Sequence, residues 1–279
     1  MRARFALTGV LLIFAFPADA TTRADCERQY TPRRVETGKD VVWLPTPDGL
    51  VVRMLEMAKV TPADLVYDLG AGDGKIAIAA AKRFGAQAVG IEYNAELARL
   101  AQCLAEVAGV AERARIVRGD IFETDFSAAT VLALYLLPEL NLRLRPTILE
   151  MQPGTRVVSH RFNMGDWQPD RTISTEGGSA YFWIVPAQVA GTWRFRPGQP
   201  SSGEEFVIRF YQQFQKLKGS TVQGGSLLRN ARLQGAQLEF TFDLQGKPAQ
   251  FSGRVDGGRI VGAVTREGVA SDYVGIWSI

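Results

Sequence analysis

The stretch Tyr67-Asp68-Leu69-Gly70-Ala71-Gly72-Asp73-Gly74-Lys75 decides the fold of this 279-residue chain. It joins a short apolar run, residues 65–69, to a helical pattern that begins at Ile76. Glycines at alternate positions directly after a strand let backbone N–H groups approach a ligand that a Cβ would exclude. The N-terminus of the next helix adds unpaired donors for an anionic group. The turn therefore predicts a nucleotide-like cofactor at the carboxyl end of a parallel sheet.

Strand-like and helix-like segments alternate after this turn. The expected strands are residues 65–69, 88–91, 115–117, 130–135 and 155–159, and the expected helices are residues 76–84, 95–108 and 139–151. This alternation predicts a parallel sheet with helices on both faces. Residues 171–174 and 180–185, joined across Gly177-Gly178, are expected to close the sheet as an antiparallel hairpin. Another helix is expected before the first strand, with Thr46 as its cap and Pro47 at its first position.

The sequence changes its pattern near Val185-Pro186. Beyond it, apolar and polar residues alternate, most clearly over residues 238–244, and glycines separate the alternating stretches. A period of two predicts strands with one buried face. We expect an all-β meander domain, either a sandwich or a small barrel, with Trp193 and Trp277 in its core.

The first twenty residues have the anatomy of a secretory signal peptide. Arg2 and Arg4 precede an apolar run over residues 5–16, and Ala18-Asp19-Ala20 is a cleavage pattern. The run is short for a membrane span, which needs about 20 residues. We therefore expect export, to the periplasm, after cleavage of residues 1–20. An uncleaved anchor and a wrongly assigned start codon are the alternatives, and the protein would be cytoplasmic if the signal were not used.

Composition sets further bounds on partners and metals. Apolar residues make up 46% and charged residues 22% of the chain, as is ordinary for a protein with a core. The net charge of +3 is small and dispersed, so we expect no nucleic-acid partner. No metal-ligand spacing occurs, and His160 is the single histidine. Cys26 and Cys103 could pair in an oxidising compartment, but the mid-helix, apolar setting of Cys103 favours two unpaired thiols.

Three acids select the class of cofactor. The spacing D-x-G-x-G-x-G from Asp68 differs from the dinucleotide fingerprint G-x-G-x-x-G, which disfavours an NAD-dependent oxidoreductase. Glu92 ends the second strand, where a carboxylate can accept both ribose hydroxyls. Asp120 ends the third strand and adds a carboxylate near the base. Three acids would repel a pyrophosphate and suit a sulfonium cation with a free amino group.

At these residues the chain resembles the class I S-adenosylmethionine-dependent methyltransferases, which have a Rossmann-like sheet. Trp43-Leu44-Pro45-Thr46-Pro47, Arg161-Phe162 and Trp167 resemble the small Dot1-like protein-lysine methyltransferases within that superfamily. The resemblance covers roughly residues 40–185 and leaves the β tail unexplained. It implies an α/β methyltransferase that uses S-adenosylmethionine to N-methylate a protein lysine or a similar amine.

The domain organisation follows from these patterns. We expect a signal peptide over residues 1–20, an N-terminal extension over 21–45, a methyltransferase domain over 46–186 and the all-β domain over 187–279.

The resemblance also implies roles for single residues. Asp68, Gly70 and Gly72 would cradle the methionine moiety of the cofactor, together with Ala71 and Gly74 of the same turn. Glu92 would bind the ribose hydroxyls, and Asp120 and the Ile121 amide would bind the adenine. A glycine turn needed only for strand–helix packing is the alternative, and the two further acids argue against it.

Methyl transfer from a sulfonium requires alignment and exclusion of water rather than a strong base. Tyr135 is a candidate to line the acceptor channel, with core packing as its alternative, and Glu139 is a candidate to hold a cationic acceptor. His160 is a candidate base, although a structural role is favoured. Asp166 and Trp167 are candidates to shape the acceptor mouth.

One conflict leaves a second function open. S-adenosylmethionine is made in the cytoplasm, whereas residues 1–20 predict export. Either the segment is not cleaved, or the cofactor reaches the envelope, or the domain has lost catalysis and kept its fold. The last case gives the alternative function, an exported, non-catalytic binding protein on a methyltransferase-like frame, with the β tail as the recognition element. The sequence leaves the methyl acceptor and the partner of the tail open.

Overall fold

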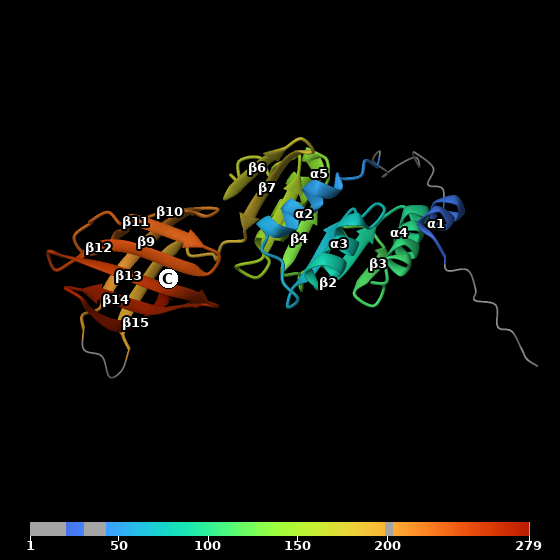
Figure 1. Ribbon diagram of the computed structural model, residues 1–279. Coiled ribbons are helices and arrows are strands. Elements are labelled where there is room, and N and C mark those ends of the chain that lie inside the picture. Colours follow the sequence, from blue (N-terminus) through green and yellow to red (C-terminus); the bar gives the residue numbers. More distant parts are fainter. Residues whose placement is uncertain (1–20, 31–42, 199–202, 279) are drawn as a thin grey trace, which may run out of the picture.

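A computed structural model of the chain describes residues 21–30, 43–198 and 203–278 (Figure 1). The expected signal peptide, residues 1–20, lies outside the described residues. Among the described residues, no helix combines the length and the apolar character needed to cross a bilayer.

The first part of the chain is an α/β domain with one seven-stranded sheet. Its elements are α1 (Arg23–Gln29), α2 (Asp48–Met57), β1 (Leu65–Leu69), α3 (Lys75–Phe84), β2 (Gln87–Glu92), α4 (Ala95–Val107), β3 (Ala114–Arg118), β4 (Val131–Leu134), α5 (Pro138–Leu149), β5 (Arg156–His160), β6 (Arg171–Thr175) and β7 (Gly178–Ile184). The strand order is β3-β2-β1-β4-β5-β7-β6. The first five strands are parallel, and β7 and β6 close the sheet as an antiparallel hairpin. The predicted fold class and closing hairpin are confirmed.

Two apolar cores cover the two faces of this sheet. One includes Val66 of β1 and the buried residues of α2 and α3, and the other includes Leu69 and the buried residues of α5. Because β1 is covered on both faces, it reads as a continuous apolar run rather than an alternating one. Because β1 to β5 are parallel, the carboxyl end of β1, where Asp68 lies, is at the same edge of the sheet as the carboxyl ends of β2, β3, β4 and β5.

The predicted cap of α2 is wrong. Pro47 is at the N-cap position, the helix begins at Asp48, and no side chain caps it. The Thr46 hydroxyl instead lies 3.1 Å from Nδ1 of His160, in a site where Thr46 is buried. The Thr46 hydroxyl therefore makes a tertiary hydrogen bond instead of the helix cap that the local sequence pattern predicts.

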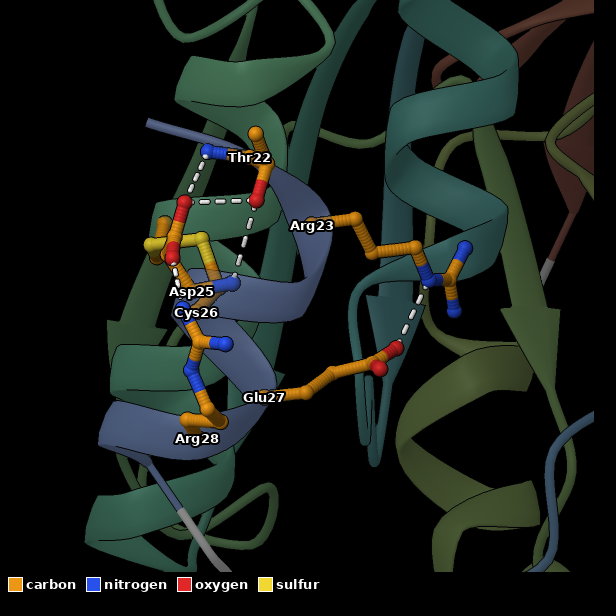
Figure 2. Close-up of a disulfide and its surroundings, with 7 residues drawn as sticks. Thr22, Arg23, Asp25, Cys26, Glu27 and Arg28 are labelled. Carbon is orange, nitrogen blue, oxygen red and sulfur yellow. Dashed lines mark hydrogen bonds and ion pairs between the residues drawn. A yellow bond between two sulfur atoms is a disulfide. The ribbon is translucent and has the colours of Figure 1, made fainter. Parts of the chain in front are cut away.

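The expectation of two unpaired thiols is also wrong. Cys26 and Cys103 form a disulfide that joins α1 to α4, with 5.8 Å between their Cα atoms (Figure 2). Cys26 lies in a small apolar cluster with Leu97, Leu100 and Leu104, on the face of α4 that carries Cys103. A mid-helix cysteine can pair when a second helix packs on its face, and the sequence alone does not reveal that packing.

The second part of the chain is an all-β domain of eight antiparallel strands. They are β8 (Gly191–Pro197), β9 (Phe206–Gln213), β10 (Lys216–Thr221), β11 (Arg229–Gln234), β12 (Gln237–Leu244), β13 (Lys247–Asp256), β14 (Arg259–Arg266) and β15 (Val269–Ser278). Each strand pairs with its neighbours in the order β10-β9-β8-β15-β14-β13-β12-β11. A bridge between Ser220 and Leu227 and a bond from the Leu228 N–H to the Gly219 carbonyl bring β10 and β11 together. The meander therefore closes on itself, as in the small-barrel alternative.

Phenylalanine rings fill the interior of this closed sheet. The packed rings are Phe195, Phe206, Phe210, Phe240, Phe242 and Phe251, with Tyr273 beside them. Trp193 is buried with them, as expected, and its Nε1 donates to the Val189 carbonyl at 2.8 Å. The prediction for Trp277 is wrong, because its side chain is 52% exposed and lies against Gly191, near the end of β15.

A hairpin tip joins the two parts of the chain. Phe214, between β9 and β10, packs against Trp167 at a ring-centroid distance of 6.0 Å, and the Arg145 guanidinium also lies over its ring. The Gln215 side chain donates to the Gln168 carbonyl at 2.7 Å. The predicted domain boundary at residue 186 falls between β7 and β8.

Candidate active site

The turn between β1 and α3 is a tight elbow built on glycine. Gly70, Gly72 and Gly74 have φ angles of 81°, 55° and 74°, in the left-handed region that favours glycine. The N–H groups of Gly70 and Ala71 both donate to the Ile91 carbonyl at 2.9 Å, which fixes the elbow to the end of β2. A Cβ on Gly72 would lie 2.3 Å from Nε1 of Trp43, so a larger residue there would be strained and would have to displace the indole.

Glu92 faces this elbow from the end of β2. Its Oε2 accepts from the Gly72 N–H at 2.7 Å and its Oε1 accepts from the Asn94 N–H at 2.9 Å. Glu92 is 8% exposed. The structure therefore brings together Asp68, the glycines and Glu92, as the sequence predicted; the ligand-binding role of each remains a prediction.

Asp120 follows β3 at the neighbouring strand end. The Gly119 N–H donates to the Glu92 carbonyl at 2.9 Å, which places the two strand ends side by side. One oxygen of the Asp120 carboxylate accepts from the Phe122 N–H at 2.9 Å, and Ile121 between them is partly buried.

Buried carboxyl groups are concentrated at the elbow. Asp68, Asp73 and Glu92 are 2%, 6% and 8% exposed. Burial raises the pKa of Asp68 to about 8, and the charges of Asp73 and Glu92 add to the shift. Burial also raises the pKa of Asp73, against the opposing effect of Lys75. Sequence reasoning gave Asp73 no role, although its place between two glycines of the motif was a visible signal.

A bound cation would reduce the electrostatic repulsion among these carboxyl groups. An anion at the elbow would add to the repulsion among three buried carboxyl groups, whereas a cation would let Asp68 ionise. The Lys75 ammonium points elsewhere, since it pairs with Asp48 at 2.9 Å. The carboxyl groups and the elbow that excludes a Cβ therefore fit the sulfonium and ammonium groups of S-adenosylmethionine. No group of three or more metal-ligating side chains occurs in the part of the chain that the structure describes.

Aromatic rings gather at the ends of β4 and β5. The ring of Tyr135 lies 4.0 Å from that of His160 and 6.4 Å from that of Phe162, measured between centroids. Tyr135 is half-buried. Glu139 lies in the first turn of α5 with its side chain exposed. The candidate roles of Tyr135 and Glu139 stay predictions.

The expectation for Trp167 at the acceptor mouth is wrong. Its side chain is fully buried between Trp183 and Phe214, where it joins the two parts of the chain. Its neighbour Asp166 is exposed and pairs with Arg145 of α5.

Sequence reasoning missed Ser159 and Asn141, which shape the turn after β5 at Arg161 and Phe162. Arg161 has a φ of 67°, which is uncommon for a residue with a side chain. The Ser159 hydroxyl donates to the Phe162 carbonyl at 2.6 Å, and the buried amide of Asn141 donates to the same carbonyl at 3.3 Å. Asn141 and Phe162 are 21 positions apart, and no local signal in the sequence indicates their contact.

Comparison with known proteins finds relatives of this chain among the lysine N-methyltransferases. The sequence model of the family described as "ANTKMT methyltransferase domain" matches residues 68–171. A protein-lysine N-methyltransferase of Saccharolobus islandicus (strain REY15A) is 50% identical over 151 residues, which cover 52% of this chain and 94% of the relative. The adenine nucleotide translocase lysine N-methyltransferase of Mus musculus is 31% identical over 160 residues, 57% of this chain and 69% of the relative.

A solved structure matches the same share of the chain. It is described as an RNA methyltransferase from Salinibacter ruber in complex with S-adenosyl-L-homocysteine. It is 50% identical, has a TM-score of 0.51, and is matched over 52% of this chain and 96% of its own. The matched family segment contains the glycine elbow, Glu92 and Asp120.

Proposed function

Because this chain belongs to the S-adenosylmethionine-dependent protein-lysine N-methyltransferases, we propose that it methylates the side-chain amine of a lysine in an acceptor protein. The observation that carries the proposal is the cluster of buried carboxyl groups at the elbow. Burial and mutual repulsion raise the pKa of Asp68 to about 8. A site of this kind suits a positively charged donor.

The elbow residues bind and orient the donor. The resemblance implies that the methionine moiety would lie against Asp68 and Gly72, the ribose against Glu92 and the adenine against Asp120. S-adenosylmethionine supplies a methyl group already activated by the positive sulfur. The protein therefore has to hold donor and acceptor in line and to exclude water.

The rings at the ends of β4 and β5 suit the acceptor. Tyr135 and Phe162 lie with their planes 25° apart and their centroids 6.4 Å apart, beside the buried His160. A lysine amine must lose its proton before it attacks, and a desolvated aromatic pocket lowers the pKa of the amine. Tyr135 is the residue that we assign to the wall of this channel.

The acceptor can be tested with labelled S-adenosylmethionine and residues 21–279. Incubation with cell-envelope protein, and separately with total RNA, followed by mass spectrometry, identifies the labelled species. The proposal predicts methyl-lysine in protein, lost in the Glu92→Ala variant. The Salinibacter protein makes RNA the competing acceptor; label in RNA and none in protein would refute lysine methylation. If the protein is instead a non-catalytic binding protein on a methyltransferase-like frame, no labelled product is expected.

Export from the cytoplasm is part of the proposal. The pattern of residues 1–20 supports it. The Cys26–Cys103 disulfide supports it too, because disulfides persist in oxidising compartments and are rare in the cytosol (Figure 2). Fractionation of cells that produce the full chain tests this: a periplasmic product that lacks residues 1–20 is expected, and a cytoplasmic product of full length would contradict it.

A further inference from the structure

One buried imidazole joins several segments on the acceptor side of the site. His160, the single histidine of the chain, is 4% exposed at the end of β5. Its Nδ1 lies 3.1 Å from the hydroxyl of Thr46, and its ring packs on Tyr135. Its Nε2 faces the turn between β6 and β7, where a Cβ on Gly178 would lie 3.0 Å away.

The neutral ring has one N–H and one lone pair, and Nδ1 shares whichever of the two it carries with the Thr46 hydroxyl. Burial lowers the pKa of His160, and the nearby Arg161 charge acts in the same direction, so the ring is neutral near pH 7.

A general base needs a lone pair within reach of the acceptor proton. Nδ1 of His160 is engaged by Thr46 and the side chain is 4% exposed, which favours a structural role for this residue.

The segment held by this bond reaches the glycine elbow. We call residues Trp43–Pro47 the strap. At one end, the indole of Trp43 lies against Gly72, 2.3 Å from where a Cβ would stand. At the other end, Thr46 bonds His160 and Pro47 lies against Gly177, 3.3 Å from a Cβ built there. The strap thus spans from the expected methionine site to the imidazole.

We propose that His160 is a positioning residue whose bond to Thr46 holds the strap, and with it Trp43, over the cofactor elbow. The inference rests on the proposed function only in taking this elbow as the place where the cofactor binds. It assigns His160 and Thr46 to cofactor retention rather than to proton transfer.

A matched pair of variants at Thr46 tests the proposal. Thr46→Val keeps the shape of the side chain and removes the hydroxyl, whereas Thr46→Ser keeps the hydroxyl. Calorimetric titration with S-adenosyl-L-homocysteine measures binding without any acceptor. Loss of one neutral hydrogen bond predicts a Kd roughly two- to tenfold higher in Thr46→Val, with Thr46→Ser close to the wild type. Equal affinity of the two variants would overturn the proposal.

The single histidine gives a second, independent measurement. Nitrogen-15 NMR of histidine-labelled protein, purified without a histidine tag, shows only His160. The Nδ1 resonance is expected to shift in Thr46→Val and to return in Thr46→Ser, because the hydrogen bond is lost in the first variant and kept in the second. An Nδ1 resonance that is unchanged in Thr46→Val would refute the bond that holds the strap. Failure of the wild type to bind S-adenosyl-L-homocysteine would instead count against the proposed function, so the two failures are distinct.

Discussion

Replacement of Asp68 by asparagine is expected to stabilise the ligand-free protein and to weaken cofactor binding. Burial, with repulsion from Asp73 and Glu92, raises the pKa of Asp68 from its ordinary value of 3.8 to about 8. Between these values the folded protein keeps a proton that the unfolded chain has lost. The free energy of unfolding therefore falls as the pH rises from about 4 to about 8.

The size of the effect follows from the shift. At pH 7 the unfolded carboxyl group is about 3 pH units above its pKa, and each unit is worth 1.36 kcal/mol, so the destabilisation is about 4 kcal/mol. Asparagine has nearly the same shape and does not titrate. In a protein of this size about 4 kcal/mol corresponds to a rise in Tm on the order of 10 °C. The advantage of Asp68→Asn should vanish near pH 4.

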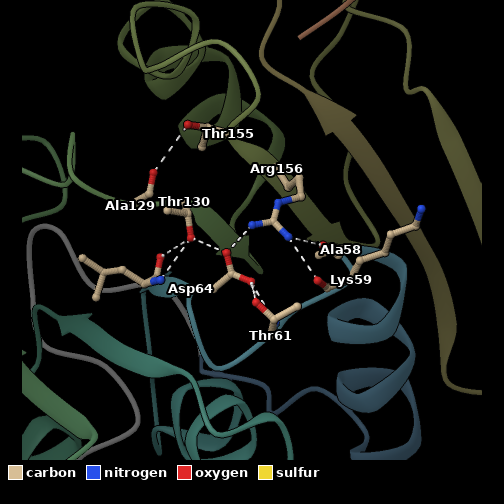
Figure 3. A network of polar contacts seen from close by, with 9 residues as sticks. Ala58, Lys59, Thr61, Asp64, Ala129, Thr130, Thr155 and Arg156 are labelled. Atoms are coloured by element: carbon tan, nitrogen blue, oxygen red, sulfur yellow. Dashed lines mark hydrogen bonds and ion pairs between the residues drawn. The ribbon is translucent and has the colours of Figure 1, made fainter. Parts of the chain in front are cut away.

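Thermal unfolding of ligand-free protein at pH 4.5 and pH 7.5 measures this difference. Asp64, at the other end of β1, is the matched control because it is also buried but has partners (Figure 3). Burial alone would raise the pKa of Asp64, but hydrogen bonds from Thr130 and Arg156 more than offset it and lower the pKa. Asp64→Asn should therefore lower Tm at pH 7.5. If Asp68→Asn lowers Tm in the same way, burial does not destabilise the ionised form of Asp68, and the expected pKa shift is refuted.

Three further substitutions test other parts of the structure. Gly72→Ala should abolish cofactor binding in calorimetry with the circular dichroism spectrum unchanged, because the φ of 55° and the indole of Trp43 exclude a side chain; retained binding would contradict this. Cys103→Ser should lower the free energy of unfolding in urea by about 4 kcal/mol, since the disulfide closes a loop with a sequence separation of 77; an unchanged unfolding midpoint would show that the bond is not formed. Phe214→Ala should lower the free energy of unfolding by about 3 kcal/mol and red-shift the fluorescence of Trp167, because the Phe214 ring stacks on the Trp167 ring. Unchanged emission would mean that the two parts of the chain do not pack there.

Local patterns predict the elements of this fold well, and contacts between distant residues account for the errors. The alternation of apolar runs predicts β1 to β5 in order, because a strand buried on both faces must be apolar throughout. The period of two predicts the strands of the second part but not which tryptophan is inside. Trp193 and Trp277 are directly opposite each other on paired strands, yet only Trp193 is buried in the closed sheet.

The same distinction applies to the candidate site. Asp68, Glu92 and Asp120 were predictable because each lies at or just after the end of a strand, and parallel strands end at one edge of the sheet. The bond between Thr46 and His160 joins residues 114 positions apart, and the local pattern assigned Thr46 to a helix cap instead. The pairing of Cys26 with Cys103 likewise depends on how α1 packs on α4.

The central claim is that buried carboxyl groups at the glycine elbow bind a cationic donor. Titration of S-adenosylmethionine into residues 21–279 at pH 7, in two buffers of different ionisation enthalpy, measures both binding and the protons released. With a pKa of about 8, Asp68 is about nine-tenths protonated before the cofactor binds and ionised afterwards. The account predicts one-to-one binding with release of about one proton; no binding, or binding without proton release, would contradict it.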